Sequence, residues 1–160
     1  MTDPKPARTD ADLGRTLADF SIASEPGNER MAMETVAEAV KNLGVSGENL
    51  ERLKTAVAEA TMNAMEHGNE YRPEVPVELQ VLVTDQDILV RITDRGSGPP
   101  PSEDADAPDI VAKLEGLQTP RGWGLFLIKS MVDEMSVTGD EHHHTVELVM
   151  HLDDRAEGGK

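Results

Sequence analysis

The sequence predicts an α+β fold, a two-layer α/β sandwich with a mixed, mostly antiparallel sheet covered on one face by about three helices. Apolar residues recur at every second position, as in half-buried strands, in the segments 17–24, 77–83, 88–92 and 146–152. They recur every three or four positions, as in amphipathic helices, in the segments 28–43, 46–68 and 123–135. With one more strand before Gly139, the order is β-α-α-β-β-lid-α-β-β.

The N-terminal part begins with a polar segment, residues 1–15, which contains two prolines and is expected to be a flexible arm. After the first strand, Asn28 is expected to cap the first helix and Gly44 to end it. Ser46 is expected to cap the second helix. The core-facing stripe of the first helix is Met33, Val36, Val40 and Leu43.

The second helix carries the first candidate site. Glu59 and Asn63 are four residues apart and therefore share one face, away from the apolar stripe. That stripe is Leu50, Leu53, Val57, Ala60 and Ala64. A carboxylate can accept a proton, and an amide oxygen can bind a hard cation. Taken alone, the pair also fits an ordinary solvated acidic face.

The strand 88–92 leads into a second candidate, Asp94. Alternation places Asp94 on the same face as Ile88, Val90 and Ile92, so its carboxylate is expected to be buried. A buried carboxylate needs a donor, which is either a turn amide, Arg95 or the N–H group of a ligand. Gly96 and Gly98 follow, and they allow the backbone to turn sharply against a planar ligand.

Residues 95–121 contain five prolines and form the predicted lid. The segment runs into Arg121, Gly122 and Gly124, where a third helix is expected from Trp123 to Met135. Glycine at a helix entry exposes backbone N–H groups that favour an anion, and arginine adds a positive charge. An ordinary glycine-rich helix entry would have the same sequence. The domain is expected to span 16–153, with a flexible tail at 154–160.

Composition narrows the function classes. The 160 residues carry a formal charge of −16, which disfavours direct nucleic-acid binding and favours a protein partner with a basic surface. There is no cysteine, which excludes disulfides and thiolate metal sites. No apolar run is long enough to cross a membrane, and no signal peptide is recognisable, so a cytoplasmic location is expected. The run His142 to His144 lies in a predicted hairpin turn and is not expected to bind a metal.

The three candidate segments resemble one known superfamily. Glu59-x-x-x-Asn63, Asp94-x-Gly96-x-Gly98 and Gly122-x-Gly124 have the order and approximate spacing of the N, G1 and G2 boxes of Bergerat-fold (GHKL) ATPases. The run from Val57 to Gly68 and the helix after Gly124 are similar to those of bacterial anti-sigma factor serine/threonine kinases of the RsbW and SpoIIAB type. This resemblance covers about residues 17–152.

The resemblance implies a role for each matching residue. Glu59 would be the general base, Asn63 the Mg²⁺ ligand and Asp94 the acceptor for the adenine amino group. The remaining ATP-binding residues would be Gly96, Gly98, Arg121, Gly122, Trp123, Gly124 and Leu125. Arg121 lies directly before the glycine, where some members of the family have their arginine one residue earlier.

The resemblance also implies a function. The protein would be an ATP·Mg-dependent serine/threonine kinase and anti-sigma factor, which binds a sigma factor, phosphorylates a STAS-domain antagonist and forms a homodimer. An alternative is a non-catalytic nucleotide-binding module that acts by partner sequestration. A third interpretation, the catalytic half of a histidine kinase, is disfavoured because residues 1–50 contain no histidine.

Overall fold

The structure is a computed structural model that describes residues 14–96 and 120–152. The described elements are, in chain order, β1 (Arg15–Ile22), α2 (Glu29–Val40), a 3₁₀ turn (Lys41–Leu43), α3 (Gly47–Asn63), a π-helical turn (Ala64–Gly68), β2 (Val77–Val83), β3 (Asp87–Asp94), α5 (Pro120–Met131), β4 (Glu134–Gly139) and β5 (His144–His151). Residues 1–13 of the predicted arm (1–15), residues 97–119 of the predicted lid (95–121) and the whole predicted tail (154–160) lie outside the described residues.

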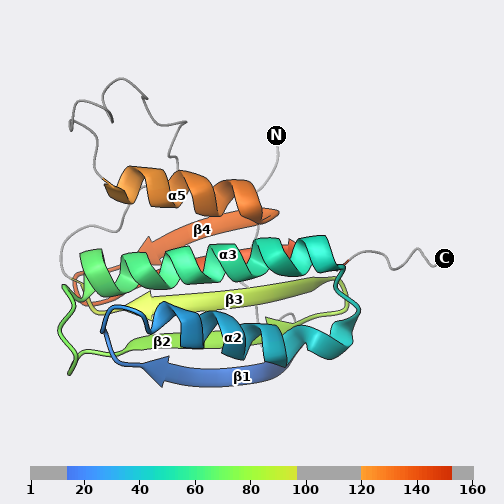
Figure 1. The fold of residues 1–160 in the computed structure, drawn as a ribbon, viewed down its shortest axis with the longest axis horizontal. Coiled ribbons are helices and arrows are strands. Elements are labelled where there is room, and N and C mark those ends of the chain that lie inside the picture. Colours follow the sequence, from blue (N-terminus) through green and yellow to red (C-terminus); the bar gives the residue numbers. More distant parts are fainter. Residues whose placement is uncertain (1–13, 97–119, 153–160) are drawn as a thin grey trace.

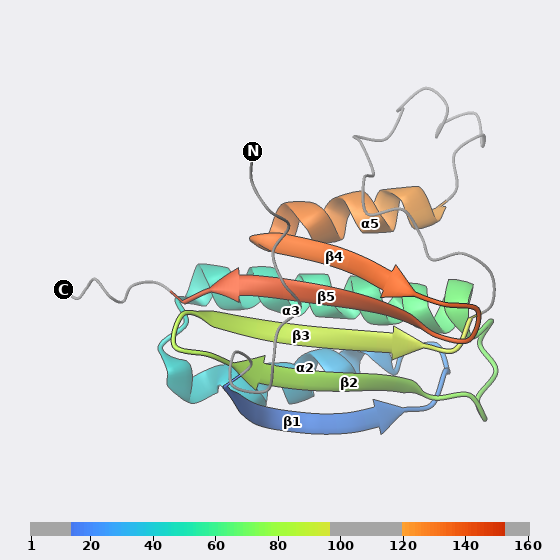
Figure 2. The ribbon, with the colours of Figure 1, turned by 180° about the vertical axis from the view of Figure 1, so that it is seen from behind.

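The five described strands form one sheet in the order β1-β2-β3-β5-β4, and every neighbouring pair is antiparallel. Figure 1 shows α2, α3 and α5 on the same face of this sheet, with α3 between the other two. The view from behind shows the strands with no helix in front of them (Figure 2). The predicted α+β two-layer fold is therefore confirmed.

The main core lies between the helices and the sheet. It contains the even-numbered residues of β3, namely Ile88, Val90 and Ile92, as their alternation predicts. The predicted stripe of α3 is buried from Leu53 to Ala64, and Leu50 is half-buried at its edge. A second, small cluster of Leu82, Leu89 and Val149 consists of neighbouring residues on the other face of the sheet.

The helix caps agree with the sequence at two of three positions. The Oγ of Ser46 accepts a hydrogen bond from the N–H of Asn49 at 3.1 Å, so Ser46 caps α3 as predicted. Gly44 ends the first helical segment with φ 77°. Asn28 is not a side-chain cap, because its Nδ2 donates instead to the carbonyl of Ala23 at 2.9 Å.

The third helix is shifted relative to the prediction. It begins at Pro120 rather than Trp123, which agrees with the preference of proline for the first helical turn. It ends at Met131 rather than Met135, because the N–H of Asp133 already donates to the carbonyl of Val149 in the sheet. Met135 therefore lies in β4, although it still packs against the main core.

No helix among residues 14–96 and 120–152 is both long and apolar enough to cross a membrane.

Candidate functional site

Three element ends meet at one end of the molecule. Figure 1 shows the C-terminal ends of α3 and β3 and the N-terminal end of α5 on the same side. These ends carry the three predicted segments, since α3 ends at Asn63, β3 ends at Asp94 and α5 begins at Pro120. The fold therefore gathers residues that are far apart in the sequence.

Gly124 in α5 lies directly against the polar pair of α3. A Cβ atom built at Gly124 would lie 2.7 Å from Nδ2 of Asn63 and 2.8 Å from Oε2 of Glu59. Both side chains therefore reach the same point, and only glycine leaves room for them there. This contact brings together the first and third predicted segments.

The polar face of α3 is less exposed than a solvated acidic face would be. Asn63 is only 8% exposed, and Glu59 is half-buried. Nδ2 of Asn63 is buried without a hydrogen-bond partner among the described residues. Such an orphaned donor fits a site that holds a polar ligand, because a buried amide group without a partner is costly.

The protonation of Glu59 is shifted by its surroundings. Burial raises the pKa of the Glu59 carboxyl group above its ordinary value, and the negative charges of Glu66 and Glu29 raise it further. A raised pKa brings a carboxylate closer to the range in which it exchanges protons at neutral pH. The environment thus suits Glu59 to accept a proton from a reacting group.

Asp94 is buried, 4% exposed, as its place in the alternation of β3 predicts. Its Oδ1 accepts a hydrogen bond from the N–H of Gly96 at 2.7 Å, which is the turn amide considered from the sequence. Arg95 does not pair with Asp94 but with Glu78, at 3.3 Å. Gly68 packs against the carboxylate so closely that a Cβ there would lie 2.5 Å from each carboxylate oxygen.

Asn69 holds this part of the site together through hydrogen bonds. Its role was not predicted from the sequence. It is fully buried, and its Nδ2 lies within hydrogen-bond distance of the Ser24 Oγ and of the carbonyls of Val75 and Pro76. Its Oδ1 accepts from the N–H of Arg95 at 2.8 Å. Asn69 therefore ties the end of the α3 segment to the turn after β3, directly next to Asp94.

The entry to α5 places the predicted phosphate-binding segment inside the first helical turns. An α-helix leaves its first four N–H groups without intrahelical partners, and Pro120 has no N–H. The helical amides available for an anion are therefore those of Arg121 and Gly122, while those of Trp123, Gly124 and Leu125 fall within the helix. Leu125 is buried in the main core and fixes α5 on the sheet. Gly98 lies outside the described residues.

The histidine run separates into two kinds of residue. His142 and His143 are exposed, and their N–H groups donate to Oδ1 of Asp140. His144 is only 3% exposed and faces Asp94, with Nδ1 3.4 Å from Oδ1. The part of the chain that the structure describes holds no group of three or more His, Asp or Glu side chains arranged for a metal. The burial of His144 was missed because the run reads as a turn, although the alternation of β5 could have revealed it.

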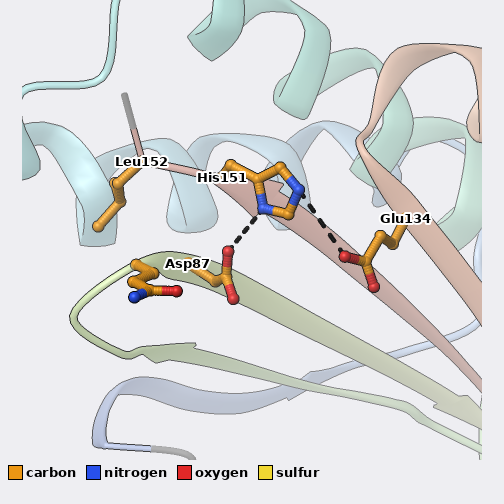
Figure 3. A pocket seen from close by; sticks show the side chains of 5 residues that line it. Asp87, Glu134, His151 and Leu152 are labelled. Atoms are coloured by element: carbon orange, nitrogen blue, oxygen red, sulfur yellow. Dashed lines mark hydrogen bonds and ion pairs between the residues drawn. The ribbon is translucent and has the colours of Figure 1, made fainter. Parts of the chain in front are cut away.

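A separate hollow lies at the opposite end of β3 and β5. It is lined by Gln86, Asp87, Glu134, His151 and Leu152 (Figure 3). His151 pairs there with Asp87 at 2.7 Å, and its other ring nitrogen lies 3.7 Å from Glu134. None of the predicted site residues lines this hollow.

The chain is also similar to known proteins in sequence. Residues 22–150 match the profile of a family described as histidine kinase-like ATPase domain. The chain is 33% identical over 134 residues to the anti-sigma F factor of Anoxybacillus flavithermus, which covers 83% of this chain and 89% of that protein. It is 32% identical over 135 residues to the anti-sigma F factor of Bacillus subtilis, with coverage of 84% and 90%.

Two solved structures share the fold. The RsbU and RsbW domains of a Mycobacterium tuberculosis protein give a TM-score of 0.60 at 16% identity, covering 84% of this chain and 32% of the longer chain. The SiaB–SiaC complex of Pseudomonas aeruginosa gives a TM-score of 0.57 at 14% identity, covering 85% and 90%.

Proposed function

Because the chain belongs to the histidine kinase-like ATPase domain family, in the branch that contains the anti-sigma F factors, we propose that it is an anti-sigma factor with ATP·Mg-dependent serine/threonine kinase activity. In this proposal it binds a sigma factor and phosphorylates a STAS-domain antagonist of that binding. The phosphorylation state of the antagonist then decides which partner the protein holds.

The observation that carries the proposal is the meeting of Glu59 and Asn63 beneath Gly124. Without this contact the first and third predicted segments would be unrelated stretches of helix. With it, a carboxylate with a raised pKa, an amide and a helix N-terminus surround one point. Asp94 supplies a buried acceptor at the neighbouring strand end. This combination fits an adenine nucleotide, since it offers complementary groups for a purine amino group, phosphates and a cation.

Asn63 is the residue that would hold Mg²⁺. Its amide oxygen suits this hard cation, and its orphaned Nδ2 can donate to a phosphate oxygen or to a water molecule. When bound, Mg²⁺ supplies neutralisation of the phosphate charge. Because the chain as a whole is strongly acidic, this neutralisation matters more than in a basic protein.

Glu59 would accept the proton of the attacking hydroxyl group. The serine or threonine oxygen of the partner forms a bond to the γ-phosphorus, the bond from that phosphorus to the β,γ-bridging oxygen breaks, and ADP leaves. Arg121 and Gly122 hold the phosphates through their amides, and Arg121 also adds a positive charge. Asp94 and the backbone around Gly96 orient the purine.

The charge and the relatives support a protein partner. The net charge of −16 favours a partner with a basic surface and disfavours nucleic acid. The curated relatives are named for their action on a sigma factor, and one structural neighbour is seen in a complex with a second protein. We propose a sigma factor and a STAS-domain antagonist as the two partners, a homodimer as the assembly, and the cytoplasm as the location.

The kinase part is tested by transfer of label from γ-labelled ATP to a panel of STAS-domain proteins from the same cell. Wild-type protein is expected to label at least one of them. Glu59→Gln is expected to bind ATP with nearly unchanged affinity and to lose transfer by roughly 100-fold or more, as expected for a general base.

Glu51→Gln is the matched control, because Glu51 is an exposed carboxylate on α3, about two helical turns from Glu59. It is expected to keep transfer. Tight ATP binding by the wild type without transfer to any STAS protein would instead support the non-catalytic sequestering module. Absence of ATP binding in the presence of Mg²⁺ would contradict both functions.

A further inference from the structure

His144 and Asp94 form a buried polar pair beside the proposed purine site. They are register partners on β5 and β3, with exposures of 3% and 4%. Nδ1 of His144 lies 3.4 Å from Oδ1 of Asp94, the same oxygen that accepts from the Gly96 amide. A histidine in the core next to a buried carboxylate is unusual, because both groups are costly to bury alone.

The sheet provides a slot for the imidazole ring. Gly139 of β4 is the register partner of His144 on its other side. A Cβ built at Gly139 would lie 2.9 Å from Cδ2 of His144 and 2.5 Å from the carbonyl oxygen of His143. The ring therefore fits because position 139 has no side chain, and it is confined between β4 and Asp94.

The opposite side of the carboxylate is also confined. The backbone of Gly68 packs against both oxygens of Asp94, and Gly96 closes the turn above it. His144 is thus the one residue among these contacts whose side chain can change the charge or the orientation of the Asp94 carboxylate.

We propose that His144 is a positioning residue that orients the Asp94 carboxylate and thereby sets the preference for a purine with a 6-amino group. This inference rests on the proposed nucleotide-binding function and deepens it. Nδ1 of His144 lies within ion-pair distance of Oδ1, and this polar contact restricts rotation of the carboxylate, so that its acceptor direction matches an amino donor. A purine with a 6-oxo group offers no such donor and is therefore rejected.

The test compares two substitutions of nearly equal shape. His144→Asn keeps a polar group at the position of Nδ1, whereas His144→Leu fills the slot without one. ATP and inosine triphosphate, which differ at the 6-position, are titrated into each protein by calorimetry with Mg²⁺. His143→Leu is the control, because its side chain is exposed on the same hairpin.

Wild type and His143→Leu are expected to prefer ATP. His144→Leu is expected to lose about tenfold in ATP affinity with little change for inosine triphosphate, so the preference falls. His144→Asn is expected to retain most of the preference. A purely structural role would weaken both nucleotides equally. An unchanged preference in folded His144→Leu would overturn this inference but not the function, whereas a wild type that binds neither nucleotide would overturn both.

A measurement on the wild type covers the case in which His144→Leu does not fold. The imidazole nitrogen signals of His144 are followed by NMR while either nucleotide is added. ATP is expected to shift the Nδ1 signal, and inosine triphosphate is expected to shift it much less. ATP binding without any change at His144 would overturn the inference.

Discussion

The same two strands carry a histidine–aspartate pair at each end, and the two pairs differ in almost every other respect. Asp94 pairs with His144 where β3 ends, and Asp87 pairs with His151 where β3 begins. The positions are separated by seven residues on each strand, an odd number, so the pairs face opposite sides of the sheet. Asp94 faces the helices, while Asp87 faces away from them.

Burial gives the two pairs different properties. The side chains of His144 and Asp94 are at most 5% exposed, whereas the side chain of His151 is 54% exposed. Water screens the exposed pair, which therefore contributes little to stability. The buried pair is confined by glycine backbones, one of which, Gly68, belongs to the helical turn that follows α3. The residue types of a pair therefore do not show whether it belongs to a site. The face of the sheet on which the pair lies and its burial make that distinction.

The largest expected difference between the two ends is in nucleotide binding. Asp94→Asn is expected to weaken ATP binding by roughly 10- to 100-fold, because an ionised acceptor for the purine amino group is lost. Asp87→Asn is expected to leave it unchanged. Calorimetric titration with ATP and Mg²⁺ measures both. Equal losses in the two variants would show that the two ends do not differ in function.

The hydrogen bonds of Asn69 lie at the Asp94 end of β3. Removal of its side chain is therefore expected to destabilise that end of the molecule. Asn69→Ala is expected to lower the free energy of unfolding by about 2–3 kcal/mol, because the Ser24 hydroxyl and the Arg95 amide lose a buried partner. Urea denaturation measures this. Asn42→Ala, at an exposed position, is the control and is expected to change stability by less than about 0.5 kcal/mol. Similar effects in both variants would refute the fastening role of Asn69.

Gly124 tests the packing of the site. Gly124→Ala is expected to cost about 1–2 kcal/mol of stability and to reduce ATP binding, because its methyl group overlaps Asn63 and Glu59. Gly47→Ala is the matched control, since it lies at the start of α3 with nothing within 4 Å of its Cβ position. Thermal denaturation and ATP titration of both variants check this. A neutral Gly124→Ala would contradict the close contact between α5 and α3.

The smallest effect is expected at the exposed pair. The hydrogen bond to Asp87 raises the pKa of His151 in the folded state, burial opposes this rise, and the charges of Asp133, Asp87 and Glu134 add to it. A raised folded pKa gives a stabilising contribution that is fully present below the unfolded pKa and is lost as the pH rises through the folded pKa. The contribution is about 0.2–1 kcal/mol because the pair is exposed.

His151→Ala is therefore expected to be slightly destabilising at about pH 5.5 and neutral at about pH 9. Urea denaturation at the two pH values measures the difference. Gln86→Ala, at an exposed position of the same hollow with no titratable group, is the control and is expected to show no pH-dependent difference. A larger effect of His151→Ala at the higher pH would contradict the sign of this linkage.

Much of the fold was predictable from the sequence because its apolar periods are regular. The alternation in β3 correctly predicted the burial of Asp94, and the stripe of α3 correctly placed Leu53, Val57 and Ala60 in the core. The predicted end of α5 was wrong because Met135 can pack into the core equally well from a strand and from a helix. The local pattern of apolar residues cannot distinguish a strand from a helix at this position. The pairing of Met135 with Leu148 of β5 determines that it is a strand.

The site was only partly predictable. The spacing of Glu59 and Asn63 placed them on one face, but their contact with Gly124 depends on how α5 packs on α3, which no local pattern encodes. Asn69 was missed because its four partners lie in three separate segments. His144 was missed because two exposed histidines precede it and conceal the strand alternation.

The central claim is that the end of the sheet at Asp94, and not the end at Asp87, receives an adenine nucleotide. A crystal structure with Mg²⁺ and a non-hydrolysable ATP analogue tests it most directly. We expect the purine amino group within hydrogen-bond distance of Asp94 and the metal ion on Asn63. A nucleotide in the hollow lined by Asp87, Glu134 and His151, with Asp94 and Asn63 untouched, would contradict it.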